Sequence, residues 1–300
     1  MTLRTLLAHA IDYAGLFPPA QLDMPGAVAE YESYLASSDA WALGRFVVPA
    51  ARLRELAAAA GDAPSNPLGS RQGERRLSVV LGADLAADVE RLRAFCADVN
   101  GEGWWRGIDA VELRASTPEA IGQAMRVVPD SVERYVEIPI SEDPTPLVLA
   151  IAGAGAYAKV RTGGTTTDAF PASDHVARFL ATCLREAVPF KATAGLHHPL
   201  RGEYPLTYEP GSACGRMYGF LNVFLATAFL AAGLDEAEAR VLLDESDPNA
   251  VTFNRTEAVW RSHRLPLDRL AESRRFLTSF GSCSFREPID DLTALGLLSP

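Results

Sequence analysis

The chain contains very little lysine. Of its 28 basic residues only Lys159 and Lys191 are lysines, and all the others are arginines. A guanidinium stays charged at any working pH, whereas a lysine amine can lose its proton when it is desolvated or lies beside another cation. A neutral amine attacks carbonyl carbons and forms a Schiff base. The two lysines are therefore the first candidates for chemistry, although a bias toward arginine codons would also make lysine rare.

Paired cysteines are absent as well. The four cysteines lie far apart and include no Cys-x-x-Cys pair; they are Cys96, Cys183, Cys214 and Cys283. Scattered cysteines of this kind are expected as free thiols, and cytoplasm is the expected location. Residues 1–13 contain no long apolar core followed by a small-residue cleavage site, so we expect no signal peptide.

Long hydrophobic runs and an excess of positive charge are also missing. The most apolar segment, Met217–Ala232, is interrupted by Asn222 and Thr227 and is too short to cross a bilayer comfortably. The formal net charge is -10, which argues against binding to nucleic acid or to an anionic membrane, because both need a basic surface. The negative net charge does not exclude a small anionic substrate, since a few local arginines are enough to bind it. The composition, 48% hydrophobic and 22% charged, is typical of a soluble globular protein.

Short apolar or β-branched runs alternate with helix-forming runs, which is the pattern of strand–helix units in a parallel sheet. We predict eight strands, at His9–Ala14, Arg45–Pro49, Leu77–Leu81, Ile108–Leu113, Arg134–Ile138, Tyr157–Arg161, Val188–Thr193 and Arg275–Phe280. Eight such units predict an α/β fold, a single (β/α)8 TIM barrel over residues 1–300. The rhythm breaks between the seventh and eighth strands, so residues 196–274 are expected as an inserted loop, helices and a hairpin over the active face.

An open, doubly wound sheet is the main alternative fold. It would place a glycine-rich phosphate-binding turn directly after the first strand. The sequence has Gly15-Leu-Phe-Pro-Pro19 there instead, without a G-x-G-x-x-G pattern. The barrel is therefore the favoured prediction.

In such barrels the catalytic groups lie at the carboxyl ends of the strands. Lys159 and Lys191 stand in the same register relative to their following glycines, on strands that are neighbours about 5 Å apart. Two ammonium groups this close would push at least one amine toward neutrality. Glu112 and Glu137, on earlier strands, are candidates to carry protons during formation and breakdown of the adduct. The alternative is that these carboxylates only form buried ion pairs with the lysines.

Two short motifs carry a family resemblance. Lys159-Val-Arg-Thr-Gly163 and Lys191-Ala-Thr-Ala-Gly-Leu196, on successive strands, resemble the deoxyribose-phosphate aldolase group of class I (Schiff-base) aldolases. The resemblance covers these two strands only. It implies a lyase in which Lys159 forms the Schiff base and Lys191 tunes the pKa of that amine.

The chain also departs from that family. Arg161 stands where the family has a small polar residue, and Ala194-Gly195 stands where the family has two glycines. The long insertion after the seventh strand has no counterpart in the resemblance. These departures affect the expected phosphorylated-sugar substrate more than the amine chemistry. A 2-oxo acid, with its carboxylate held by Arg161, fits equally well.

Further residues near the predicted strand ends are expected to bind the substrate. They are Asp12, Arg161, Thr162, Gly163, Gly164, His197, His198, Ser282 and Cys283. Ser282 and Cys283 belong to a loop whose backbone amides are candidates to bind an anion, as phosphate sites in this fold often do.

The two adjacent histidines support a rival hypothesis. His197 or His198, together with acidic strand ends, would suit a divalent-metal-dependent hydrolase or isomerase. Neighbouring residues on an extended chain point in opposite directions, however, so one strand supplies only one such ligand. The sequence has neither H-x-H nor H-E-x-x-H. A non-catalytic barrel that binds a small ligand is the third hypothesis.

The leading hypothesis is a lyase, similar to an aldolase, that acts on a small carbonyl compound through a lysine Schiff base. The substrate is expected to be sugar-like or a 2-oxo acid, and the reaction needs no cofactor and no metal ligands. The expected partner is a small molecule, not nucleic acid or a membrane. The oligomeric state stays open, with a homo-oligomer among the expectations.

Overall fold

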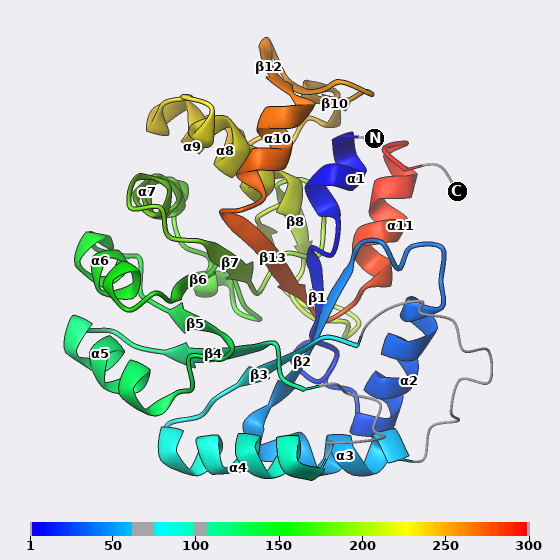
Figure 1. The fold of residues 1–300 in the computed structure, drawn as a ribbon. Helices are drawn as coiled ribbons and strands as arrows, with labels where there is room; N and C mark the ends of the chain where they lie inside the picture. The colour runs from blue at the N-terminus through cyan, green and yellow to red at the C-terminus, as the bar shows by residue number, and fades with distance from the viewer. Residues whose placement is uncertain (1, 62–74, 99–106, 299–300) are drawn as a thin grey trace.

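Eight parallel strands close into a barrel at the centre of the molecule (Figure 1). The computed structural model describes residues 2–61, 75–98 and 107–298. The strands follow one another around the ring in chain order, and the last one, β13, pairs with β1 to close it. Their bounds are β1 Ile11–Tyr13, β2 Leu43–Pro49, β3 Leu77–Val80, β4 Ala110–Arg114, β5 Glu133–Glu137, β6 Tyr157–Arg161, β7 Phe190–Thr193 and β13 Leu277–Ser282. The predicted (β/α)8 barrel is confirmed, and every predicted strand overlaps an observed one.

Helices cover the outside of the barrel, and each barrel strand is followed in the chain by one of these outer helices (Figure 1). These helices are α2 Met24–Leu35, α3 Leu53–Gly61, α4 Leu85–Asp98, α5 Pro118–Val127, α6 Thr145–Gly153, α7 Ser173–Arg185, α8 Phe220–Ala231 and α11 Arg286–Ala294. A short helix, α1 (Thr2–Leu7), precedes the first strand. In the part of the chain that the structure describes, no helix combines the length and apolar character needed to cross a membrane.

Local capping residues decide where several of these helices begin. The Asp23 side chain accepts a hydrogen bond from the backbone N–H of Gly26 at the start of α2. The Thr117 side chain does the same for Ala120 at the start of α5, with a proline in the first turn of each helix. Such caps satisfy backbone donors that have no partner inside the helix. The positions of these helices therefore follow from local sequence.

The segment between β7 and β13 divides into two parts. It contains β8 Gly202–Pro205, β9 Cys214–Met217, α8, α9 Glu236–Leu243, β10 Val251–Phe253, β11 Glu257–Trp260, β12 His263–Pro266 and α10 Leu267–Ser273. The antiparallel hairpin β8–β9 comes directly after β7, at the carboxyl ends of the barrel strands. The small sheet β10–β11–β12 instead contacts α10 and α1, next to the amino ends of the strands (Figure 1).

Only the first part of the insertion thus lies over the active face, which corrects the expectation for the whole of residues 196–274. The reason is that α8 runs back along the outside of the barrel as its seventh outer helix. Phe220 and Phe224 of α8 pack on Phe280 of β13, with ring centroids 4.9 and 5.9 Å apart. This apolar contact leads α8 away from the cavity, and the sheet β10–β11–β12 and α10 then lie near the amino ends of the strands.

A buried asparagine joins three segments near the start of α8. The Oδ1 of Asn222 accepts a hydrogen bond from the backbone N–H of Arg201 at 2.8 Å. Its Nδ2 donates to the backbone carbonyls of Leu242 at 2.8 Å and Glu245 at 2.9 Å. The side chain is fully buried. In the sequence this residue was only an interruption of an apolar run; in the fold it satisfies three buried backbone groups.

We expect Asn222→Leu to lower the free energy of unfolding by about 3 kcal/mol, because buried backbone groups that lose a partner each cost about 1–3 kcal/mol. Urea denaturation followed by circular dichroism measures the change. Thr227→Val is the matched control, because its buried hydroxyl donates only to the Val223 carbonyl of the same helix. That control should lose less than about 1 kcal/mol. Equal losses in the two variants would contradict the bridging role of Asn222.

Candidate active site

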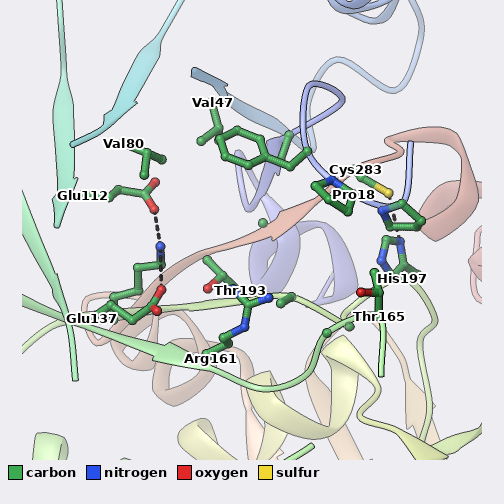
Figure 2. A pocket seen from close by; sticks show the side chains of 18 of the residues that line it. Pro18, Val47, Val80, Glu112, Glu137, Arg161, Thr165, Thr193, His197 and Cys283 are labelled. Atoms are coloured by element: carbon green, nitrogen blue, oxygen red, sulfur yellow. Dashed lines mark hydrogen bonds and ion pairs between the residues drawn. The ribbon is translucent and has the colours of Figure 1, made fainter. Parts of the chain in front are cut away.

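A cavity of about 660 Å³ opens at the carboxyl ends of the barrel strands (Figure 2). This volume is typical of a site for a small molecule. The barrel strands, the loop after β1 and the β8–β9 hairpin all contribute to its wall. The charged residues at this wall come mostly from strand ends and include Glu112, Glu137, Lys159, Arg161 and Lys191.

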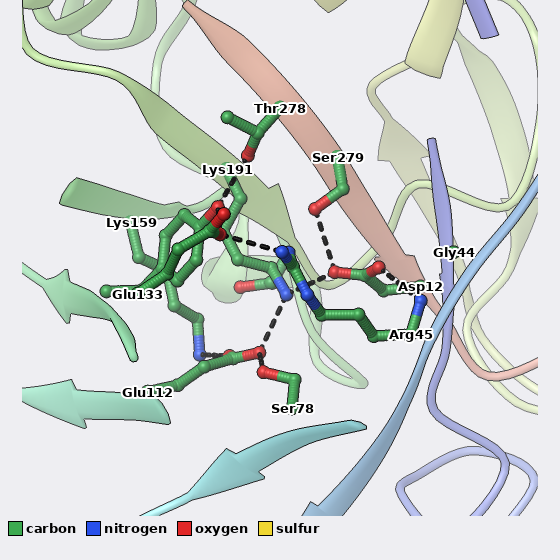
Figure 3. Close-up of polar contacts among 12 residues, drawn as sticks. Asp12, Gly44, Arg45, Ser78, Glu112, Glu133, Lys159, Lys191, Thr278 and Ser279 are labelled. Carbon is green, nitrogen blue, oxygen red and sulfur yellow. Dashed lines mark hydrogen bonds and ion pairs between the residues drawn. The ribbon is translucent and has the colours of Figure 1, made fainter. Parts of the chain in front are cut away.

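The two lysines are direct neighbours in the sheet. The pairing of β6 with β7 places Lys159 opposite Lys191, the register that their spacing from the following glycines predicted. Lys191 Nζ donates to Asp12 Oδ2 at 2.6 Å and to Glu112 Oε1 at 2.7 Å. Lys159 Nζ forms ion pairs with Glu112 Oε2 at 2.8 Å and Glu137 Oε2 at 2.9 Å. Glu112 therefore bridges the two lysines (Figure 3).

Further contacts extend this alternation of charges at both ends. At the buried end, Asp12 accepts hydrogen bonds from the hydroxyl of Ser279 at 2.7 Å and the backbone N–H of Arg45 at 2.8 Å (Figure 3). At the cavity end, Arg114 Nε lies 2.8 Å from Glu137 Oε1. Negative and positive side chains thus alternate from the buried Asp12 on β1 to the exposed Arg114 at the rim of the cavity.

The buried part of this network keeps its charges at neutral pH. Burial by itself would lower the pKa of Lys191, but the negative charges of Asp12 and Glu112 outweigh it and raise that pKa above its usual value. Burial would likewise raise the pKa of Glu112, but Lys159 and Lys191 hold it well below its usual range. Repulsion was expected to push at least one of the two amines toward neutrality. Lys191 is not that amine, because the carboxylates beside it outweigh both its burial and the repulsion.

Exposure separates the two lysines. Both lysines belong to the cavity wall, but Lys159 is 8% exposed whereas Lys191 is 0% exposed, so Lys159 is the more accessible of the two. Glu137, at 9%, is also slightly exposed, whereas Glu112 is almost completely enclosed at 1%. One amine and one carboxylate therefore face the cavity, with one of each behind them.

Four residues expected to bind substrate lie behind the cavity wall instead. Asp12 is enclosed by its bonds to Lys191 and Ser279. The Thr162 hydroxyl donates to the carbonyls of residues 193 and 194, at 3.2 and 2.8 Å. Gly163 packs against a phenylalanine ring that leaves no room for a Cβ. Ser282 is buried at 1% exposure. None of the four is among the residues that line the cavity, and their direct contact with a ligand stays a prediction.

The remaining expected residues do line the cavity: Arg161, Gly164, His197, His198 and Cys283. The two histidine rings diverge, as adjacent residues on an extended segment should. His198 Nδ1 lies 2.7 Å from Asp291 Oδ2, and its ring stacks on Tyr204 with centroids 3.6 Å apart. His197 Nδ1 instead lies 3.1 Å from Glu287 Oε2.

This divergence bears on the metal hypothesis. Among residues 2–61, 75–98 and 107–298, no group of three or more His, Cys, Asp or Glu side chains is arranged to hold a metal ion. Each histidine has its own carboxylate partner, Glu287 for His197 and Asp291 for His198. The expected cluster of one histidine with acidic strand ends is not formed by the described residues.

Sequence reasoning missed Arg114, Tyr208 and Glu287. Arg114 follows Glu112 by two residues on the same strand. Because side chains alternate between the two faces of a strand, both residues lie on one face, and this predicts Arg114 near the cavity. Glu287 stands in the first turn of α11, directly after the last barrel strand, where a site residue is expected in this fold. Tyr208 had no such signal, because only the tertiary fold brings the β8–β9 hairpin to the cavity.

Comparison with models of known protein families finds no match for this chain, and no curated protein is significantly similar to it. Functional inference therefore depends on the geometry and chemistry of the cavity. A barrel fold alone does not select one reaction, because the same fold supports many chemistries through its loops.

The acid sensitivity of the protein is expected to depend on Glu112. Its pKa is below the usual 4.5 in the folded chain, so at acid pH the unfolded chain binds more protons than the folded chain. The stabilisation is complete above that usual pKa and is lost as the pH falls through the lower, folded-state value. We expect Glu112→Gln to reduce the slope of unfolding free energy against pH below about pH 4.5, by up to about 1.4 kcal/mol per pH unit.

Urea denaturation at a series of pH values measures this slope. Glu119→Gln, at an exposed position of α5, controls for the loss of one negative charge. An unchanged slope in Glu112→Gln would contradict an ionised bridge between the two lysines.

Proposed function

We propose that this protein is a lyase that acts on a small carbonyl compound through a Schiff base on Lys159. The observation that carries the proposal is the unequal exposure of two paired lysines at the end of a barrel. Lys159 borders the cavity, whereas Lys191 is enclosed between Asp12 and Glu112. An amine nucleophile must reach its substrate, and the greater exposure of Lys159 supports this lysine as the nucleophile.

The carboxylates around Lys159 suit proton transfer. Each of the two is shared with a second cation, Lys191 for Glu112 and Arg114 for Glu137. Neither carboxylate therefore directs its whole negative charge at Lys159. Glu137 lies 2.9 Å from the amine and borders the cavity, so it is the group that takes the proton from Lys159 before attack. It returns that proton when the carbinolamine loses water.

Glu112 has a different role because it stays ionised. Its low pKa makes it a poor proton donor, but its carboxylate lies 2.8 Å from the nitrogen that becomes a cationic iminium. A fixed negative charge at that point stabilises the iminium. The iminium then accepts the electron pair of the carbon–carbon bond that breaks, leaving an enamine on Lys159. Lys191 acts on this centre through Glu112, as a positioning residue.

The resemblance to the deoxyribose-phosphate aldolase group supports the same assignment. It implies a Schiff-base lysine on the sixth strand and an electrostatic partner on the seventh, which correspond to Lys159 and Lys191. The chemistry inferred from the contacts differs in one respect: Lys191 keeps its own charge and acts by binding the carboxylate that faces Lys159.

Reductive trapping tests the nucleophile. We expect borohydride with a panel of aldehydes, ketones and 2-oxo acids to leave a stable adduct on Lys159, located by peptide mapping. Lys159→Arg keeps the positive charge between Glu112 and Glu137 but lacks the nucleophile, so it should trap nothing and lose at least about 10³-fold in lyase rate. Because Lys191 is then the only lysine, an adduct that persists on Lys191 in this variant would contradict the assignment.

Arg161 indicates which carbonyl compounds fit. It stands two residues after Lys159 on β6, so the two side chains share a face of the strand. It lines the cavity, is exposed, and forms no ion pair with a carboxylate of the described residues. Figure 2 shows it beside Thr193. We propose that Arg161 binds an anionic group of the substrate, a carboxylate or a phosphate, while the carbonyl carbon lies at Lys159.

We expect Arg161→Gln to raise KM about tenfold to a hundredfold for an anionic substrate, because hydrogen bonds to charged groups contribute about 1.5–3 kcal/mol. KM for a neutral aldehyde should stay the same, which makes it the control. Steady-state kinetics or trapping titrations with a 2-oxo acid, a phosphorylated aldehyde and glycolaldehyde measure the difference. An equal change for charged and neutral compounds would show that Arg161 only shapes the wall.

A further inference from the structure

A second group of reactive side chains lies across the cavity from the lysines. Figure 2 shows Cys283 and His197 side by side, with Glu112 and Glu137 on the opposite wall. Cys283 Sγ lies 3.8 Å from His197 Nδ1, and the same ring nitrogen lies 3.1 Å from Glu287 Oε2. The proposed Schiff-base reaction uses none of these three groups at Lys159.

The β8–β9 hairpin adds a fourth member to this group. The Tyr208 hydroxyl donates to Glu287 Oε2 at 3.0 Å and lies 3.4 Å from Cys283 Sγ. The loop after β7, the loop after β13, the start of α11 and the hairpin thus converge on one point of the wall. Cys283 and Glu287 are close in the chain, but His197 and Tyr208 come from two other segments, so the packing of the fold brings a thiol, an imidazole, a carboxylate and a phenol together.

The contacts of His197 favour the cationic form of its ring. Burial would lower the pKa of His197, but its contacts with Cys283 and Glu287 raise it to about 10. Burial would raise the pKa of Glu287, but His197 lowers it. His197 is therefore an imidazolium, whose Nδ1 lies 3.1 Å from Glu287 Oε2 with Cys283 Sγ at 3.8 Å on the same side of the ring. A cation next to a cysteine stabilises the thiolate, which is the nucleophilic form.

The other cysteines offer a comparison within the same chain. Of the four, only Cys283 lines the cavity. Cys183 is fully buried, and that burial raises the pKa of its thiol. Cys214 is exposed on β9 and serves as an ordinary accessible thiol. The position of Cys283 is thus distinct in both access and charge environment.

We propose that Cys283 is a second covalent site of this cavity, at which its sulfur, with His197 beside it and Glu287 holding the His197 ring, adds to the carbonyl carbon of an aldehyde. The proposal rests on the proposed function for the identity of its ligand. Cleavage of a carbon–carbon bond at Lys159 leaves one fragment as an enamine on the lysine and the other as an aldehyde. The cavity would then bind each fragment with its own nucleophile, an amine on one wall and a thiol on the other.

The addition is balanced without any oxidant or cofactor. The Cys283 proton is first on His197, so the sulfur carries the free electron pair. That pair forms the sulfur–carbon bond, and the π pair of the carbonyl moves to its oxygen. The oxygen takes the proton from His197, and the product is a neutral thiohemiacetal that reverts by the same steps. The aldehyde is held reversibly until it leaves the cavity or rejoins the enamine.

Alkylation by iodoacetamide, read by peptide mass mapping, tests the thiol in the intact chain. We expect Cys283 to react faster than the exposed Cys214, although Cys283 is only 5% exposed. His197→Gln should slow alkylation of Cys283 about tenfold or more and leave Cys214 unchanged, because the cation that favours the thiolate is lost. The comparison of the two cysteines needs no variant of the cluster. Cys283 reacting no faster than Cys214 would overturn the proposal.

Protection by an aldehyde tests the covalent site. Glycolaldehyde should slow alkylation of Cys283, but not of Cys214, both in the parent chain and in Lys159→Arg. Protection that is absent from both chains would overturn aldehyde addition at Cys283. Borohydride trapping on Lys159 is measured separately in Cys283→Ser. If borohydride traps an adduct on Lys159 but glycolaldehyde does not protect Cys283, only the thiol site is rejected. If glycolaldehyde protects Cys283 but nothing is trapped on Lys159, the Schiff-base function is rejected and the thiol site is retained.

Discussion

The arrangement of the barrel mouth depends on the carboxylate of Glu112. One of its oxygens bonds Lys191 and the other pairs with Lys159, so a single buried side chain on β4 orders the ends of β6 and β7. Buried charges must be paired, and removing one partner of such a pair typically costs about 3–5 kcal/mol. Asp12 on β1 and Glu137 on β5 complete the alternation. The stability of this ionic network and the placement of Lys159 at the cavity therefore have the same physical origin.

The cavity has two chemically different walls. The first carries Lys159 with Glu137 at its edge, and the second carries Cys283 with His197. Arg161 stands on the same strand face as the lysine and forms no ion pair with a described carboxylate, which suits a carbonyl substrate with an anionic end. The two groups proposed as nucleophiles lie on opposite walls of the cavity, which suits the proposed reaction with its two carbonyl fragments.

Local patterns predicted the architecture well. The spacing of the predicted strands was enough to predict the barrel. The equal distance of Lys159 and Lys191 from their following glycines predicted that the two lysines lie opposite each other in the sheet. Contacts between segments were not predictable in this way. Repulsion between the lysines was expected to push at least one amine toward neutrality. The pKa of Lys191 instead rises despite burial, because Asp12 comes from the other end of the chain and adds a negative charge that the neighbouring strand did not reveal. Thr162, within the motif that begins at Lys159, donates its hydroxyl to backbone carbonyls.

The sequence by itself determined the order of the strands, the position of the two lysines on neighbouring strands and the set of residues at the strand ends. These features follow from periodicity and from the rules of parallel pairing, which act over a few residues at a time. The tertiary structure decided which lysine faces the cavity, how the charges are paired and that Cys283 meets His197. Those outcomes depend on the closure of the barrel and on where α8 and the β8–β9 hairpin pack, and such long-range contacts leave no local signature in the chain.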